Sequence, residues 1–159
     1  MTAMDWLFVG SIFTLSLGAV SSCPLYWIPH EESCYVIPQV AQSWASSVAF
    51  CMAHGAHLAE ITSPEENNFL SNLVKQNHPP GSQIWIGGTD ALSEGNWIWS
   101  HTEEIFQYQN WDSGQPSNYG GSEHCVTIRT NGKWNDNPCC ENLHSICEKR
   151  RMTGPGVGK

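Results

Sequence analysis

The segment 111–140 constrains the fold more than any other part of the chain. In its second half, Asn131-Gly132 separates two β-prone runs, 125–130 and 133–136. This pattern predicts a β-hairpin with a two-residue turn. A cysteine stands at each end of the hairpin, and a Cys125–Cys139 disulfide would staple it.

The same segment carries oxygen-bearing side chains that could bind a metal ion: Gln115, Ser117, Glu123, Asn135 and Asp136. Oxygen-only donors, part carboxylate and part amide, suit a hard cation such as Ca²⁺ better than zinc. The stapled hairpin would also hold Glu123 beside Asn135 and Asp136, because these residues flank it in sequence. We therefore expect a calcium site at this end of the hairpin.

The two ends of the chain are expected to lie outside the folded domain. Residues 6–20 are apolar and uncharged, but this run is short for a membrane span. Small residues at 19–22 suit signal cleavage near 21/22, so we expect residues 1–21 to be a signal peptide, although a basic start is missing. The alternative is an uncleaved anchor helix. After cleavage no spanning run remains, which predicts a secreted protein, and the Gly- and Pro-containing tail 150–159 is expected to be disordered.

All seven cysteines follow the apolar run. A secreted chain meets an oxidising compartment, so most cysteines should pair, and the odd number leaves one thiol. The net charge of −8 argues against nucleic acid as a partner, because binding to phosphates needs a basic surface. We expect no enzyme activity either, since we find no nucleophile–base arrangement, zinc motif or phosphate loop.

Two helices are predicted in the first half of the chain. Ser43 precedes a helical pattern that ends near Gly55, with apolar positions at Trp44, Val48, Cys51 and Met52. Ser63-Pro64-Glu65-Glu66 is a helix start with a serine N-cap, proline at the first position and glutamate three residues after the cap. The buried stripe of this second helix is expected to contain Phe69, Leu70, Leu73 and Val74.

Strands are predicted before and after these helices. Residues 23–37 read as a hairpin that a Cys23–Cys34 bond would staple, and later strands are predicted at 84–88, 96–100 and 143–148. The tryptophans of the central strands are expected in the core rather than at a sugar-stacking surface: Trp85, Trp97 and Trp99.

Over residues 23–149 the chain resembles a C-type lectin domain of the long form. The motifs that carry the resemblance are Trp85-Ile86-Gly87, Ser93-Glu94-Gly95-Asn96-Trp97, Asn110-Trp111, Gly114-Gln115-Pro116-Ser117, Asn131-Gly132-Lys133-Trp134-Asn135-Asp136 and Ile146-Cys147-Glu148. The resemblance implies an α+β fold, the double-loop C-type lectin fold, with two helices and two small antiparallel sheets. It also implies disulfides between Cys23 and Cys34, Cys51 and Cys147, and Cys125 and Cys139. Cys140 is left over, and two readings stay open: an interchain disulfide in a homodimer, or a free or capped thiol.

The resemblance also implies a binding site. Calcium-binding members use a Glu-Pro-Asn or Gln-Pro-Asp tripeptide around a cis proline, a following glutamate and a Trp-Asn-Asp segment. Those positions here are Gln115, Ser117, Glu123, Asn135 and Asp136, which would bind both Ca²⁺ and sugar hydroxyls. Asp90 and Glu94 match the first two ligands of an accessory calcium site, whereas Asn118 and His124 stand where acids often occur.

The tripeptide sets the expected ligand. Gln115 matches members that resemble galactose binders, but Ser117 matches neither class and removes a negative charge, so we expect weaker Ca²⁺ binding. Tyr119 could stack on the apolar face of galactose, or it could be an ordinary exposed tyrosine. The expected function is calcium-dependent binding of glycans with terminal galactose or N-acetylgalactosamine. The biological role stays open, with innate immunity as one candidate. The alternative is a C-type-lectin-like domain that binds a protein or a surface without sugar.

Overall fold

The computed structural model describes residues 21–153, so the predicted signal peptide lies outside them except for its last position. In chain order the elements are β1 (Ser21–Ser22), β2 (Ile28–His30), β3 (Ser33–Val36), α1 (Trp44–Ala53), β4 (His57–Leu58), α2 (Pro64–Asn77), β5 (Gln83–Thr89), β6 (Ile98–Trp99), the 3₁₀ helix η1 (Tyr119–Gly121), β7 (Glu123–Arg129), β8 (Trp134–Pro138), β9 (Cys147–Arg150) and β10 (Met152–Thr153).

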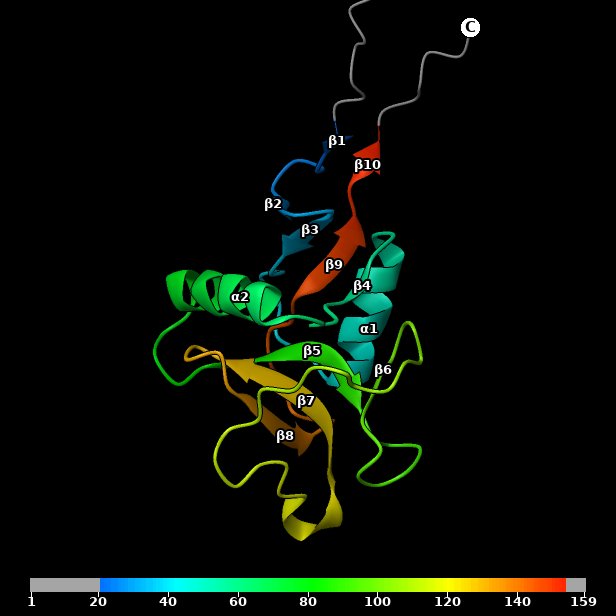
Figure 1. Ribbon diagram of the computed structural model, residues 1–159, viewed down its shortest axis with the longest axis vertical. Helices are drawn as coiled ribbons and strands as arrows, with labels where there is room; N and C mark the ends of the chain where they lie inside the picture. Colours follow the sequence, from blue (N-terminus) through cyan, green and yellow to red (C-terminus); the bar gives the residue numbers. More distant parts are fainter. Residues whose placement is uncertain (1–20, 154–159) are drawn as a thin grey trace, which may run out of the picture.

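The strands form two four-stranded sheets and a short ribbon. One sheet has the order β2-β3-β9-β4 and the other β6-β5-β7-β8, and every strand pair in them is antiparallel. In Figure 1 the first sheet lies in the upper half, with α1 and α2 beside it, and the second sheet lies below. This arrangement confirms the predicted fold class. The β1–β10 ribbon is an addition that the sequence patterns did not predict.

The β7–β8 hairpin forms as predicted, but its turn is one residue longer. The Arg129 N–H donates to the Lys133 carbonyl at 2.9 Å, so three residues separate the paired positions. Gly132 closes this loop with a φ of +81°, a backbone conformation that glycine adopts without steric cost. The prediction of a two-residue turn was therefore wrong, because the glycine comes last in a three-residue loop.

The predicted closing strand is displaced along the chain. Residues 143–146 do not continue one ladder, because Leu143 bridges to Gln42 while Ser145 bridges to Trp85. Regular pairing begins only at Cys147 and continues to Arg150. Arg150 ends β9 and residues 152–153 form β10, where a disordered tail was predicted; residues 154–159 lie outside the described part of the chain.

Both helices begin where predicted, and each has a serine N-cap, of which the one at Ser63 was predicted. The Ser63 hydroxyl accepts the Glu66 N–H at 3.1 Å, and the Ser43 hydroxyl accepts the Ser46 N–H at 3.3 Å. The apolar face of α1 is narrower than predicted, because Met52 is 66% exposed. Gly55 follows the α1 C-cap with a φ of +64°, which ends the helix where the sequence predicted.

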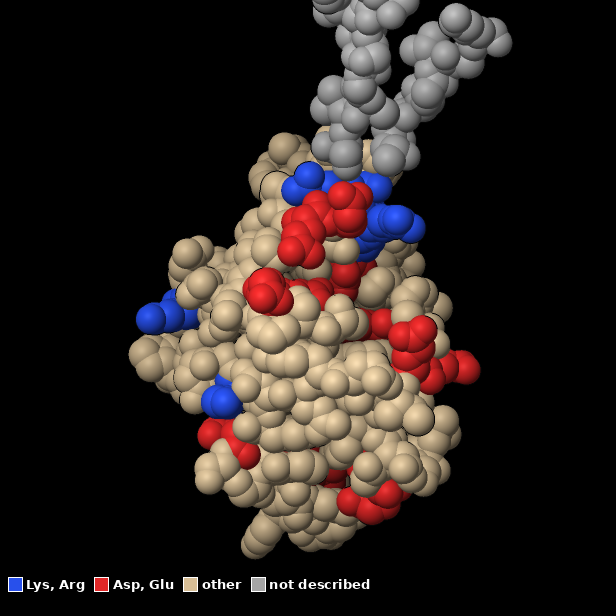
Figure 2. Space-filling view, viewed as in Figure 1, with Lys and Arg blue, Asp and Glu red and all other residues tan. Residues whose placement is uncertain are grey.

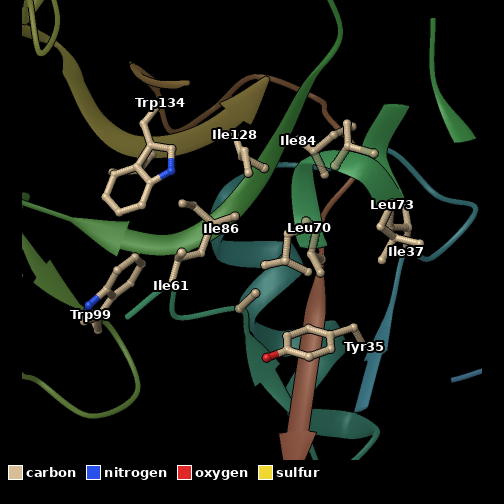
Figure 3. Close-up of a cluster of buried hydrophobic side chains, with 14 of the residues drawn as sticks. Tyr35, Ile37, Ile61, Leu70, Leu73, Ile84, Ile86, Trp99, Ile128 and Trp134 are labelled. Atoms are coloured by element: carbon tan, nitrogen blue, oxygen red, sulfur yellow. The ribbon is translucent and has the colours of Figure 1, made fainter. Parts of the chain in front are cut away.

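The core lies between the second sheet and α2, and it is built from branched aliphatic and aromatic side chains (Figure 3). Trp85, Trp97 and Trp99 are 0%, 6% and 2% exposed, which confirms that they pack in the core. A buried amide links the layers: Asn67 of α2 accepts the Trp134 indole N–H at 2.8 Å and donates to the Gly132 carbonyl at 3.0 Å. The hairpin is thus fixed against the helix.

Three disulfides staple these elements as the resemblance implied. They join Cys23 to Cys34, Cys51 to Cys147 and Cys125 to Cys139. Within the described residues Cys140 is the free cysteine, and it is exposed.

Candidate functional site

The site is built on a long loop that is anchored at both ends to the β7–β8 hairpin. At its start, the Trp134 N–H donates to the Asn110 carbonyl and the Asp112 N–H donates to the Trp134 carbonyl, each at 2.9 Å. The Trp111 ring packs edge-on against Trp134, with the ring centroids 5.8 Å apart. At its end, the loop enters β7, which the Cys125–Cys139 disulfide ties to the residue after β8.

Two carboxylates hold the middle of this loop. Asp136, which is fully buried, accepts the backbone N–H groups of Ser117 at 3.0 Å and Asn118 at 2.6 Å. Glu123 accepts the Tyr119 N–H at 2.7 Å and the Ser117 hydroxyl at 2.9 Å, both on Oε2. Its Oε1 accepts no hydrogen bond from the described residues. Negative charge therefore gathers on one side of the loop, with acceptor capacity left over.

Gln115 adds an acceptor without a donor. Its peptide bond to Pro116 is cis, as the resemblance implied, and the backbone of Asn118 turns back through the left-handed region with a φ of 42°. The Oε1 atom of Gln115 is buried and has no hydrogen-bond partner among the described residues. A buried acceptor without a partner is costly unless a donor or a cation reaches it. Gln115 and the two carboxylates all belong to this loop or to the hairpin that holds it, and their oxygens are of the kind that a hard cation such as Ca²⁺ prefers.

Asn135, the remaining predicted ligand, is held by other groups. Its side-chain oxygen accepts from Arg129 Nη2 at 2.9 Å, and its Nδ2 donates to the Asp136 carbonyl at 2.6 Å. Arg129 in turn donates to Asp112 at 2.6 Å. Sequence reasoning missed Arg129 and Asp112. The only signal would have been the hairpin register, which pairs Thr127 with Asn135 and so places Arg129 two residues further along the same face of β7.

The predicted accessory residues do come together. Asp90, Glu94 and His124 offer ligand atoms that all lie within 4.8 Å of one another. His124 Nδ1 lies 3.0 Å from Asp90 Oδ1 and 3.5 Å from Glu94 Oε2, while the other oxygen of Asp90 accepts the Gly95 N–H at 2.8 Å. The imidazole therefore stands directly against both carboxylates, at the position where the family often has an acid.

The rim of the loop is open. Tyr119 is 82% exposed and begins η1, the yellow segment at the lower end of Figure 1. On the face shown in Figure 2, acidic but not basic side chains reach this lower end, whereas basic side chains gather near the opposite end. A flat exposed ring beside an acidic loop suits a ligand that has both an apolar face and hydroxyl groups.

A second group of carboxylates lies in the upper half of the molecule, in a groove of about 520 Å³ between β3, β9 and α2. Here the Tyr35 hydroxyl donates to Glu66 at 2.6 Å and lies 3.2 Å from Glu148. Glu148 also accepts the Ser33 hydroxyl at 2.7 Å and the Glu60 N–H at 3.1 Å. Burial raises the pKa of Glu66 above its ordinary value of 4.5, and the charge of Glu148 adds to this rise. Burial likewise raises the pKa of Tyr35.

The fold and the anchored loop together define a disulfide-stapled binding domain. A family model, the Lectin C-type domain, matches residues 40–149. The chain belongs to the C-type lectin domain family, and its expected classification as a binding domain rather than an enzyme is confirmed.

Individual relatives agree with this assignment. The chain is 38% identical to human asialoglycoprotein receptor 2 over 81% of its own length, but spans only 41% of that protein. It is 36% identical to the galactose-specific lectin nattectin of Thalassophryne nattereri, with 82% of each chain covered. Among solved structures, the carbohydrate-recognition domain of the mouse scavenger receptor C-type lectin is 32% identical, with a TM-score of 0.76, 82% of this chain covered and all of that one. Within residues 21–153, no helix has the length and apolar character needed to cross a membrane.

Proposed function

We propose that this chain is a calcium-dependent lectin domain for glycans that end in galactose or N-acetylgalactosamine. The observation that carries the proposal is the buried, unpartnered Oε1 of Gln115 in a loop held by the carboxylates of Asp136 and Glu123. These three side chains and the Ser117 hydroxyl would hold Ca²⁺. The bound ion would supply coordination sites for a pair of vicinal sugar hydroxyls.

The preference for galactose is supported by the loop and by one relative. Gln115 stands first in the tripeptide, as in the members that resemble galactose binders. The exposed Tyr119 ring at the rim can cover the apolar face of a galactose ring. The relative named a galactose-specific lectin aligns over most of both chains. Each contact is weak by itself, so we expect low affinity for a single sugar and stronger binding to clustered glycans.

Secretion and dimerisation belong to the same proposal. Three disulfides suit an oxidising compartment. The exposed thiol of Cys140 could join two copies, which would double the number of binding loops. A non-reducing gel of the wild type and Cys140→Ser tests this: a dimer band in the wild type alone supports the link, and a monomer in both contradicts it.

The second candidate is a domain that binds a protein or a surface without sugar. Two observations favour it: Ser117 provides no carboxylate, and the Asn135 oxygen is taken by Arg129. Both reduce the number of ligands available to Ca²⁺.

Retention on galactose-agarose decides between the two candidates. We expect the wild type to bind in millimolar Ca²⁺, to elute with a chelator, and to bind a mannose resin less well. Glu123→Gln is a nearly isosteric control that removes one charge from the loop, and it should pass through both resins. Tyr119→Ala should weaken retention on galactose and leave calcium affinity unchanged. If the wild type is retained by neither resin at millimolar Ca²⁺, the lectin proposal fails and the protein or surface ligand takes its place.

A further inference from the structure

The side-chain amide of Asn135 is fixed by two neighbours. Asn135 is only 6% exposed, and its oxygen accepts from Arg129 Nη2 at 2.9 Å. Its Nδ2 donates to the Asp136 carbonyl at 2.6 Å. A guanidinium only donates hydrogen bonds and a carbonyl only accepts them. The two contacts therefore dictate which end of the amide faces which way.

Arg129 is itself tethered. Its Nη1 lies 2.6 Å from Asp112 Oδ2, and the two side chains are 30% and 27% exposed. Asp112 is fixed in turn, because its backbone N–H donates to the Trp134 carbonyl of β8. A charged, partly buried pair of this kind is stronger than a neutral surface contact. The guanidinium is therefore held against Asn135 by the same segment that starts the binding loop.

This arrangement separates two residues that are adjacent in sequence. The carboxylate of Asp136 reaches the N–H groups of Ser117 and Asn118. The oxygen of Asn135 is instead directed to Arg129. Turning that oxygen toward a cation beside Asp136 would rotate the amide and bring its NH₂ group against the guanidinium. Two donors would then face each other.

The geometry points to Arg129 as a positioning residue that withholds Asn135 from the calcium shell. Arg129 is an internal cation that occupies the Asn135 oxygen, and Asp112 keeps it in place. Calcium affinity of the loop is thereby set below the value that the full oxygen set would give. This inference rests on the proposed calcium-dependent function, and it names Arg129 as the residue that lowers the calcium affinity of the loop.

A double-mutant cycle tests the inference on the whole chain. Arg129→Met removes the donors but keeps an aliphatic stem on the strand. Calcium affinity is measured by calorimetry for the wild type, Arg129→Met, Asn135→Ala and the double variant. We expect Arg129→Met to bind Ca²⁺ about tenfold more tightly, because a further oxygen ligand becomes free. Asn135→Ala should change the wild-type affinity by no more than about twofold, yet abolish the gain in the Arg129→Met background.

Two further readouts separate positioning from a general loss of structure. In calcium-free protein, the side-chain amide resonance of Asn135 should shift in Arg129→Met and remain near its wild-type position in Arg129→Lys, which keeps a donor. Asp112→Asn, which loosens the tether, should give part of the affinity gain. Thermal unfolding of each variant without calcium checks that the chain is folded.

The possible outcomes test the role of Arg129 separately from the proposed lectin function. If wild-type affinity is measurable and Asn135→Ala weakens it about tenfold or more, Asn135 is already a ligand and the inference is wrong while the lectin proposal stands. Unchanged affinity in Arg129→Met has the same meaning. Calcium binding by Arg129→Met alone supports the inference. If no folded variant binds calcium, the proposed function fails and the inference fails with it.

Discussion

The two carboxylate clusters of this domain have opposite designs. In the upper groove, Glu66 and Glu148 accept hydrogen bonds from hydroxyl groups of β3 and from backbone N–H groups of the segment between β4 and α2. In the binding loop, both oxygens of Asp136 accept backbone N–H groups, but Glu123 accepts hydrogen bonds on Oε2 alone, and Gln115 contributes an acceptor with no donor among the described residues. The first cluster completes its hydrogen bonds within the protein, whereas the second leaves capacity for something else.

A structural carboxylate cluster and a binding one can be told apart by their hydrogen bonds. Both clusters are acidic and both include a residue that is nearly or fully buried, so neither charge nor burial identifies the site. What differs is that two acceptors of the loop, Glu123 Oε1 and Gln115 Oε1, have no donor among the described residues, whereas both oxygens of Glu66 and of Glu148 have one. The most informative variants are therefore those that change one cluster and are measured for both calcium affinity and stability.

The largest effect is expected from Asp136→Asn. The amide would turn an NH₂ group toward one of the two backbone N–H groups that Asp136 now accepts, and it would remove a charge from the loop. Calcium affinity should fall on the order of 100-fold. Calorimetry at fixed pH measures this change. A fall of less than about twofold would mean that this buried carboxylate only holds the loop in place and does not bind the ion.

The next effect should appear in stability rather than binding. Glu148→Ala removes the acceptor of Ser33, Tyr35 and the Glu60 N–H, and we expect unfolding to become easier by about 2 kcal/mol. Calcium affinity should stay within about twofold of the wild type. Urea unfolding and calorimetry on the same sample provide both numbers. A loss of calcium binding comparable to that in Asp136→Asn would show that the clusters are coupled.

A gain is expected from Ser117→Asp. The Ser117 hydroxyl lies 2.9 Å from Glu123 Oε2, so a carboxylate there would restore the missing charge but repel Glu123 when no ion is bound. We expect calcium affinity to rise about tenfold and calcium-free stability to fall. Ser113→Asp adds the same charge to an exposed position of the loop and serves as the matched control. An equal gain in both variants would mean that net charge, and not position, tunes the site.

The smallest effect is a difference in pH dependence within the upper groove. Burial raises the pKa of Glu66 above its ordinary value of 4.5, so the folded state binds a proton more readily than the unfolded state. The stabilisation from this group is complete below that ordinary value and is lost as the pH rises through the raised one. We compare the free energy of unfolding of the wild type with that of Glu66→Gln, both in the presence of a chelator. The advantage of the wild type should increase as the pH is lowered from neutral. Parallel pH profiles for the two chains would contradict this assignment.

The sequence predicted the frame of the site better than its contacts. Ser63 marked the start of its helix because a cap is a local signal, and the apolar spacing after Ser43 marked the other helix. The cysteines matched a known pattern of disulfides. The hairpin turn was missed by one residue because Gly132 can close either turn length. The bridge from Asp112 through Arg129 to Asn135 joins a loop residue to the two strands of the hairpin, and it depends on a register that is known only after folding.

The β1–β10 ribbon has a practical consequence. It lies at the end of the domain opposite η1, and both ends of the described chain leave through it (Figure 1). A support coupled to either end would leave the loop facing away from it. Copies fixed to a bead or a lipid layer would then all present their binding loops outward, away from the support. Such a layer would bind a ligand that carries many sugars at matching distances far more tightly than a ligand that carries one.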